Sequence, residues 1–106
     1  MEDLKGYQKK YLKGLAHNLK PVVFVGQKGM TPTVTASVNE SLENRELIKV
    51  KFVDFKEKPH KEEINTAIEN ETGSKLVGVI GHVAIFYRRQ KDSKKRKIVV
   101  PIRKTE

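Results

Sequence analysis

The chain has 106 residues, no cysteine and a formal net charge of +9. This length allows one domain with a modest core, and the lack of cysteine excludes a disulfide framework, a thiol nucleophile and a cysteine-based zinc site. No apolar stretch approaches the ~20 residues that span a membrane, and the N-terminus lacks the apolar region of a signal peptide, so we expect a soluble protein of the cytoplasm.

The positive charge is concentrated at the two ends of the chain. Residues 1–31 carry six Lys against two acidic residues, a net +4, and residues 32–87 carry a net −2. Residues 88–106 carry nine basic residues against two acidic ones, a net +7. Such an asymmetry indicates a polyanionic partner. We favour a nucleic acid over an anionic membrane surface, because no basic segment has the strongly apolar face of a membrane-surface helix.

Residues 3–19 have the apolar spacing of an amphipathic helix, although Gly6 and Gly14 weaken it. On another face of this helix, basic side chains follow one another at intervals of four residues: Lys5, Lys9, Lys13 and His17. Like charges at this spacing slightly disfavour an isolated helix. The stripe is therefore either a partner-binding surface or a solvated lysine face, and the pattern alone favours neither.

A glycine loop follows the apolar run of residues 22–25. The unbroken run predicts a short strand buried on both faces. Gly26-Gln27-Lys28-Gly29 then forms a Gly-x-x-Gly loop, and Thr31 and Pro32 are suited to the N-cap and first position of a helix. A strand, a glycine loop and a helix N-terminus together offer N–H groups and positive potential to a phosphate, and Lys28 adds a full charge. By itself, however, such a glycine pair is often a plain turn.

The remaining elements follow from apolar spacing and turn residues. A helical period predicts helices over residues 32–44 and 60–72, the second ended by Gly73. Strands are predicted over residues 47–53, 76–80 and 83–87, the last two joined by a Gly81-His82 turn. Residues 98–102 are predicted as an edge strand, because Pro101 excludes a central one. The order α-β-α-β-α-β-β indicates a single α/β domain over residues 1–106.

Residues 88–97 are the largest concentration of charge in the chain. We predict a loop here whose basic residues contact a polyanion, the alternative being a solvated, mobile loop. Among the aromatic residues near basic ones, we expect only Tyr7 or Tyr11 to be free to stack on a nucleic-acid base, and the others, Phe24 included, to lie mostly in the core.

No pattern in the sequence indicates catalysis. His17, His60 and His82 lie in different segments without the spacing of metal ligands, and no Ser/His/Asp arrangement can be placed. The glycine loop lacks the length and the Lys-Ser/Thr ending of a nucleotide-binding P-loop. We therefore expect a protein that is not an enzyme and holds no metal or other cofactor.

Residues 12–31, with the sequence LKGLAHNLKPVVFVGQKGMT, closely resemble the signature of the CRM domain family (chloroplast RNA splicing and ribosome maturation) in its single-domain bacterial, YhbY-like form. The resemblance continues through ELIKVK at residues 46–51, ETG at 71–73, VIG at 79–81 and FYR at 86–88. It implies a compact α/β fold with a four-stranded mixed sheet, similar to the C-terminal domain of translation initiation factor three, plus an N-terminal helix. It also implies an RNA-binding protein associated with precursors of the large ribosomal subunit.

The resemblance also points to particular residues. The family's glycine loop, similar to the loop with which KH domains clamp RNA backbone, maps onto residues 26–29, and the basic face of the first helix maps onto residues between 9 and 20. The lysine-rich loop around residues 91–95 departs from the family pattern. With that loop included, the predicted RNA-binding residues are Lys9, Lys13, His17, Lys20, Gly26, Gln27, Lys28, Gly29, Thr31, Arg88, Arg89, Lys94, Lys95 and Arg96.

We therefore expect a monomeric, non-catalytic RNA-binding protein that acts on ribosomal RNA during assembly of the large subunit. The alternatives are a permanent ribosomal protein and a nuclease that processes precursor RNA.

Overall fold

The computed structural model describes residues 3–53 and 58–102. The elements in chain order are α1 (Gly6–Ala16), β1 (Val23–Val25), α2 (Pro32–Arg45), β2 (Leu47–Phe52), α3 (Lys58–Thr72), β3 (Lys75–Ile80), β4 (Val83–Tyr87) and the short 3-10 helix η1 (Ser93–Lys95). The predicted order of helices and strands is confirmed. Residues 54–57, part of the loop predicted before the third helix, lie outside the described residues.

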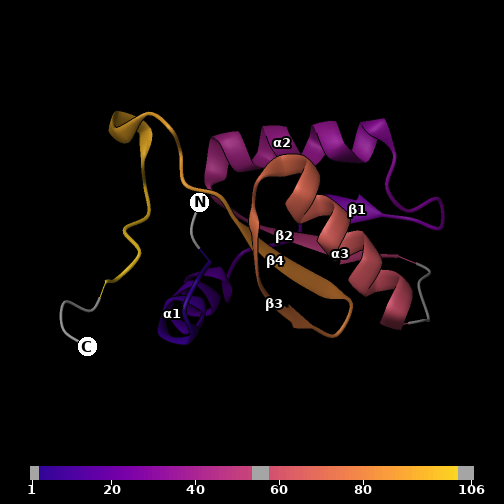
Figure 1. Ribbon diagram of the computed structural model, residues 1–106, viewed down its shortest axis with the longest axis horizontal. Helices are drawn as coiled ribbons and strands as arrows, with labels where there is room; N and C mark the ends of the chain where they lie inside the picture. Colours follow the sequence, from indigo (N-terminus) through magenta and orange to yellow (C-terminus); the bar gives the residue numbers. More distant parts are fainter. Residues whose placement is uncertain (1–2, 54–57, 103–106) are drawn as a thin grey trace.

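The four strands form one mixed sheet in the order β1-β2-β4-β3. β1 and β2 are parallel, whereas β4 is antiparallel to both of its neighbours, β2 and β3. Helices α2 and α3 lie on one side of this sheet and α1 on the other (Figure 1). The expected α/β domain with a four-stranded mixed sheet is therefore confirmed.

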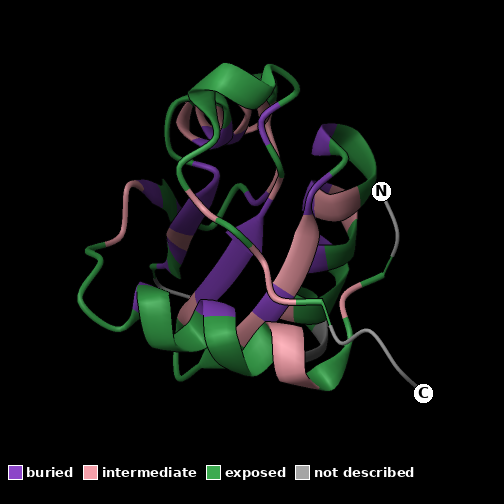
Figure 2. Cartoon of the chain, turned by 90° about the vertical axis from the view of Figure 1, so that its left-hand side faces the viewer, coloured by how far each residue is buried: buried purple, intermediate pink, exposed green. Residues whose placement is uncertain are grey.

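Alternate residues along the strands build two cores. On one side, Val38 and Leu42 of α2 and Ile64 and Ile68 of α3 pack against a set of strand residues that includes Val50. On the other side, residues of α1 pack against the opposite face of the strands; this second core contains Leu12, Ala16, Leu47, Val77, Ile85 and Tyr87. Figure 2 shows the result, with buried strands in the centre and exposed outer surfaces on the helices.

Local sequence signals mark several element boundaries as predicted. The Thr31 hydroxyl accepts a hydrogen bond from the Val34 N–H at 3.2 Å, and Pro32 occupies the first turn of α2. After α3, Gly73 has a φ of 69°, the left-handed conformation that ends many helices and that glycine adopts without strain. Gly81 has a φ of 59° in the turn between β3 and β4.

The prediction that β1 is buried on both faces is wrong. Val23 and Val25 are buried, but the Phe24 side chain between them is 58% exposed. β1 is an edge strand, and α1 packs mainly against β2, β3 and β4, so the α1 side of β1 stays open. The placement of Phe24 in the core is wrong for the same reason.

The predicted edge strand over residues 98–102 is also wrong, because this segment is irregular. The N–H groups of Lys97 and Ile98 donate to the Glu46 carboxylate instead of to a neighbouring strand, and Pro101 has no N–H to donate. Ile98 and Val100 pack against the core beneath α1. The segment thus covers that core without extending the sheet.

Candidate nucleic-acid interface

The glycine loop is a tight turn fixed against α3. The Gly29 N–H donates to the Gly26 carbonyl oxygen at 2.9 Å, and Gly29 has a φ of +66°. A Cβ on Gly29 would lie 3.5 Å from the Ile64 Cδ1 atom, whereas a Cβ on Gly26 would meet nothing within 4 Å. Gln27 and Lys28 are exposed at the tip. The positive φ therefore favours glycine at position 29, while the space above Gly26 is open to a ligand.

The loop presents fewer N–H groups than the sequence led us to expect. The Gly29 N–H closes the turn, so it is not among the loop N–H groups left for a phosphate. Within the described residues, the backbone N–H groups of Gln27 and Lys28 make no hydrogen bond. At the start of α2, Thr31 caps Val34, so its hydroxyl is engaged in the fold. The donors left for an anion at the tip are those of Gln27 and Lys28.

The basic stripe of α1 lies over the sheet. Lys9, Lys13 and His17 are exposed, and the Lys13 side chain lies so close over Gly78 of β3 that a Cβ there would collide with it. At the end of α1, the Lys49 ammonium donates to the His17 carbonyl oxygen at 3.4 Å. The exposed Lys20 follows, and the three residues of β1, about 10 Å long, then lead to the glycine loop. The structure therefore brings the predicted α1 residues and the predicted loop into one neighbourhood.

Charge is segregated between the two sides of the sheet. Among the described side chains, the acidic residues of α2 and α3 lie on one side and outnumber the basic ones there, Arg45 and Lys61; these acidic residues are Glu40, Glu43, Glu62, Glu63, Glu69 and Glu71. On the α1 side, Asp3 is paired with Lys75 at 2.8 Å, and this hydrogen bond lowers the pKa of Asp3. Lys49 and Lys51 of β2 point to the α1 side, because Ile48, Val50 and Phe52 point to the other core. The α1 side therefore carries an excess of positive charge.

The basic loop of residues 88–97 lies elsewhere. Because β4 is antiparallel to β2, this loop begins beside the start of β2, whereas the glycine loop lies beside its end. The six residues of β2 span about 17 Å between the strand ends at which the two loops begin. The two loops then extend away from the strand in opposite directions (Figure 1). Arg89, Lys94, Lys95 and Arg96 are exposed. The predicted site therefore consists of two separate basic regions.

Arg88 is part of the fold's own hydrogen-bond network. Its guanidinium donates to the Asn39 side-chain oxygen at 2.8 Å, to the Thr72 carbonyl oxygen at 2.7 Å and to the Asn39 carbonyl oxygen at 3.1 Å. The Glu43 carboxylate lies 3.7 Å away. These contacts tie the end of β4 to α2 and α3, so the Arg88 guanidinium is occupied within the fold.

Sequence reasoning missed Glu46, which organises the basic loop. Glu46 is 2% exposed and caps α2 with a φ of 64°. Its carboxylate accepts hydrogen bonds from the backbone N–H groups of Gln90 at 3.0 Å, Lys97 at 2.6 Å and Ile98 at 3.2 Å. Burial, and then the Glu46 charge, raise the pKa of Tyr87. A single acidic residue after a helix gives no sequence signal for this role.

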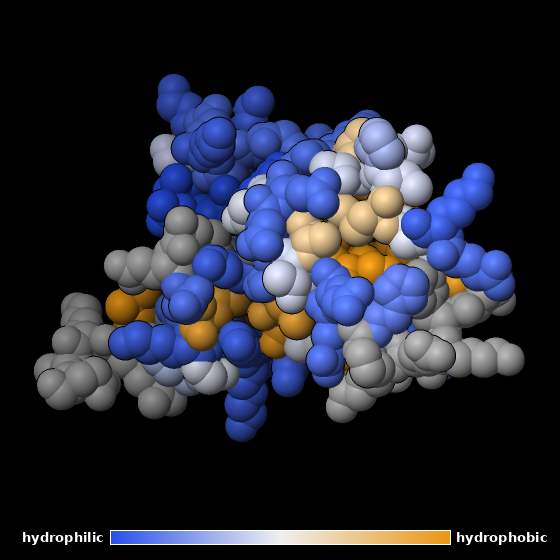
Figure 3. All heavy atoms as spheres, turned by 45° about the vertical axis from the view of Figure 1, so that its right-hand side comes forward, coloured by the Kyte–Doolittle hydropathy of each residue, from blue (hydrophilic) through white to orange (hydrophobic). Residues whose placement is uncertain are grey.

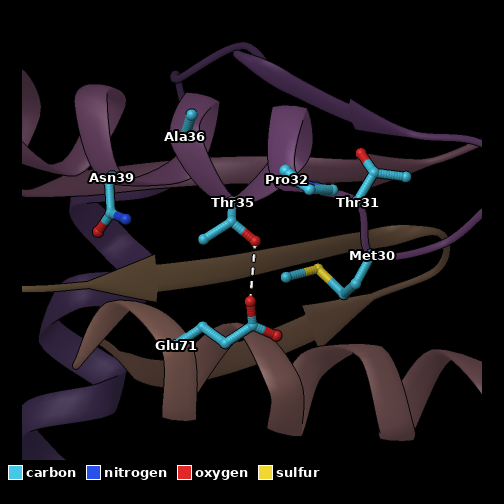
Figure 4. Close-up of a pocket in the computed structure, with 7 residues that line it drawn as sticks. All are labelled: Met30, Thr31, Pro32, Thr35, Ala36, Asn39 and Glu71. Atoms are coloured by element: carbon cyan, nitrogen blue, oxygen red, sulfur yellow. Dashed lines mark hydrogen bonds between the residues drawn. The ribbon is translucent and has the colours of Figure 1, made fainter.

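A shallow groove of about 530 Å³ lies between α2 and α3, next to the glycine loop. Its lining residues are Met30, Thr31, Pro32, Thr35, Ala36, Asn39 and Glu71 (Figure 4). The Thr35 hydroxyl donates to the Glu71 carboxylate at 3.0 Å, and the lining contains no basic residue. The Glu71 carboxylate would repel a phosphate, so the groove is a poor site for the RNA backbone.

On the face drawn in Figure 3, hydrophilic residues predominate and hydrophobic residues are visible only in small patches between them.

Two other features are absent from the described part of the chain, a metal-binding cluster and a membrane-spanning helix. Over residues 3–53 and 58–102, no group of His, Asp and Glu side chains is placed to hold a metal ion. None of the described helices combines the length and apolar character needed to cross a membrane.

Comparisons with known proteins agree with this architecture. Residues 4–88 match the model of the CRS1 / YhbY (CRM) domain. An "RNA-binding protein" of Haemophilus influenzae is 43% identical over 94 residues, covering 89% of this chain and 94% of that protein. "Probable RNA-binding protein YqeI" of Bacillus subtilis is 35% identical over 91 residues, covering 86% of this chain and 94% of that protein.

A solved structure has the same fold. The solution structure of the hypothetical protein SAV1595 from Staphylococcus aureus superposes with a TM-score of 0.76 at 37% identity, and the match covers 92% of this chain and 99% of that one. Sequence, topology and these comparisons lead to one conclusion: the chain belongs to the CRS1/YhbY (CRM) domain family.

Proposed function

We propose that this protein binds RNA without catalysing a reaction, and that the glycine loop and the α1 side of the sheet form the binding surface. The segregation of charge carries this proposal: the lysines of α1 and β2 share one side, and the glutamates of α2 and α3 lie on the other. The names of the Haemophilus and Bacillus relatives support it as well.

The proposed mechanism is capture of the RNA backbone. The N–H groups of Gln27 and Lys28 bind a phosphate, and the absence of a side chain at Gly26 allows the sugar-phosphate chain to come close. Lys13, Lys20 and Lys28 neutralise neighbouring phosphates. Contacts of this kind position RNA and carry little sequence information, so selectivity comes from RNA shape or from unpaired bases.

We further propose that the RNA is ribosomal RNA in precursors of the large subunit, bound by a monomer in the cytoplasm. The resemblance to single-domain bacterial CRM proteins supports this assignment. A permanent ribosomal protein would stay on mature particles through high-salt washing, whereas an assembly factor should wash off and prefer immature ones. A processing nuclease would cleave labelled RNA in the presence of Mg²⁺.

The test is the double variant Gln27→Asp/Lys28→Asp, measured by fluorescence anisotropy with a labelled ribosomal RNA fragment. A matched control, Asn44→Asp/Arg45→Asp, changes the net charge by the same amount at exposed positions near the end of α2. We expect the loop variant to lose at least about tenfold more affinity than the control, because it also places carboxylates beside the N–H donors. Equal losses in two folded variants would refute backbone capture by this loop.

A gradient experiment tests the ribosomal part. In a low-magnesium sucrose gradient of cell lysate, we expect the wild-type protein with particles near the large subunit and the loop variant at the top. Wild-type protein at the top in all salts would refute the ribosomal assignment and leave RNA binding itself intact.

A further inference from the structure

One row of side chains on the α1 side of the sheet is left uncovered by the described helices and loops. Phe24 of β1 pairs with Lys51 of β2, Lys51 with Val83 of β4, and Val83 with Ile80 of β3. These four neighbours point away from the α2 and α3 core, because Val23, Val25, Val50, Phe52 and Ala84 fill that core. The row crosses all four strands, a width of about 14 Å at ~4.8 Å per strand. We call it the open row.

The open row is mostly apolar yet exposed. Phe24 is 58% exposed and Ile80 63%, and Val83 is half-buried. The coverage by α1 stops one row away, where Lys13 lies over Gly78 and His17 lies over Lys49. Exposed apolar side chains that gather in one place, with an aromatic ring among them, mark a contact surface more often than single scattered ones do.

The charge around the open row is positive. Lys51 lies within it, and Lys49 and Lys13 border it. Within the described residues, Lys51 has no acidic partner, and Asp3 is paired with Lys75 at the opposite end of β3. An apolar partner protein or a second copy of this chain would have to bury these ammonium groups without compensation, which is costly. A polyanion with flat apolar groups satisfies both the charges and the exposed ring.

We propose that the open row binds unpaired RNA bases, with one base stacked on Phe24 and the next against Val83 and Ile80. Lys13, Lys49 and Lys51 then neutralise the phosphates that link these bases. The inference rests on the proposed RNA-binding function and adds the part of the ligand that is recognised. Phe24 lies about two residues before the start of the glycine loop, so one strand of RNA can contact both the open row and the loop. Stacking on an aromatic ring tolerates any base, so this contact selects single-stranded RNA over duplex RNA.

The test compares a single-stranded RNA with a duplex of equal length, using the variants Phe24→Thr and Phe24→Tyr. Threonine keeps the β-propensity of the edge strand and removes the ring, whereas tyrosine keeps the ring. A matched apolar control is Val79→Ala, set against Ile80→Ala: Val79 is 50% exposed on the same strand but points to the other side of the sheet. Circular dichroism confirms that each variant is folded.

We expect Phe24→Thr to weaken binding of the single-stranded RNA by about five- to a hundredfold and binding of the duplex by less than about twofold. Phe24→Tyr should restore the affinity, and Ile80→Ala should weaken it more than Val79→Ala. Bases over the open row should also shift the Val83 and Ile80 methyl NMR resonances upfield.

Wild-type binding with no effect of Phe24→Thr, or an equal loss for single-stranded and duplex RNA, would overturn the open-row proposal and leave RNA binding by the loop intact. A wild-type protein that binds neither RNA would overturn the proposed function itself, and this inference with it.

Discussion

The two glycines of the loop are expected to respond in opposite ways to alanine. Gly29 has a φ of +66°, and its Cβ would lie at an ordinary 3.5 Å from Ile64, so an alanine there meets backbone strain without a collision. That strain amounts to about 1–2 kcal/mol, partly offset by about 0.4–1 kcal/mol from the lower entropy of the unfolded chain. We expect Gly29→Ala to lower the free energy of unfolding by about 0.5–1.5 kcal/mol, a fall in Tm of about 2–12 °C.

Gly26→Ala should leave stability unchanged or slightly raised, because Gly26 is outside the positive-φ region and its Cβ meets nothing within 4 Å. The substitution should instead lower the affinity for RNA. A methyl group that pushes a phosphate off one N–H donor removes a hydrogen bond to a charged group, about 1.5–3 kcal/mol, or about 10- to 150-fold in Kd.

Thermal unfolding and fluorescence anisotropy on the same samples separate these effects. Wild-type affinity in Gly26→Ala would show that RNA does not approach that backbone closely. A loss of stability in Gly26→Ala as large as that in Gly29→Ala would show that position 26 also needs the conformational freedom of glycine. Either result refutes part of the reasoning, and the two failures are distinguishable.

Three further predictions concern the other basic region and its supports. Glu46→Gln should lower the free energy of unfolding by about 1–3 kcal/mol and speed amide hydrogen exchange at Gln90 and Ile98, because their N–H groups lose a charged acceptor. Unchanged exchange at these two amides would contradict the role of Glu46 as an anchor of the loop. Arg88→Met should destabilise the domain by a similar amount in urea unfolding, because the Asn39 and Thr72 acceptors lose their donor. Full stability with reduced RNA affinity would instead show that Arg88 contacts RNA. The third change neutralises three exposed cations of the basic loop, Lys94, Lys95 and Arg96. It should reduce affinity evenly across RNAs and lower the slope of log affinity against log salt by up to about 2, at ~0.7 per phosphate. A loss of affinity confined to one RNA would contradict this prediction.

Local signals in the sequence were enough for most of the fold. Thr31 and Pro32 start α2 and Gly73 ends α3 because caps and left-handed residues act within a few positions of the chain. The exposure of Phe24 could not be predicted in the same way, because it depends on where α1, distant in sequence, lies across the sheet. The irregular course of residues 98–102 likewise depends on a contact with Glu46, more than fifty positions away.

The same distinction between local and long-range signals applies to the candidate site. The loop over residues 26–29 and the stripe on α1 are short-range patterns, and both were found in the sequence. Their distance from the loop over residues 88–97 is set by the antiparallel pairing of β4 with β2, a long-range property with no local signal. The engagement of Arg88 within the fold follows from that same pairing, since β4 delivers it to Asn39 and Thr72.

If the basic loop of residues 88–97 binds RNA as the glycine loop is proposed to do, the rigid strand between the two basic regions makes the domain a bivalent binder with a fixed spacing. A strand cannot stretch or fold, so the length of β2, about 17 Å, sets a fixed minimum for the separation of the two regions, which corresponds to at least about five stacked nucleotides at ~3.4 Å each. An RNA too short to bridge the gap engages one region at a time, whereas a longer one gains the effective concentration of a tethered second contact. Affinity should therefore rise in a step, rather than gradually, as the length of an oligonucleotide passes this span.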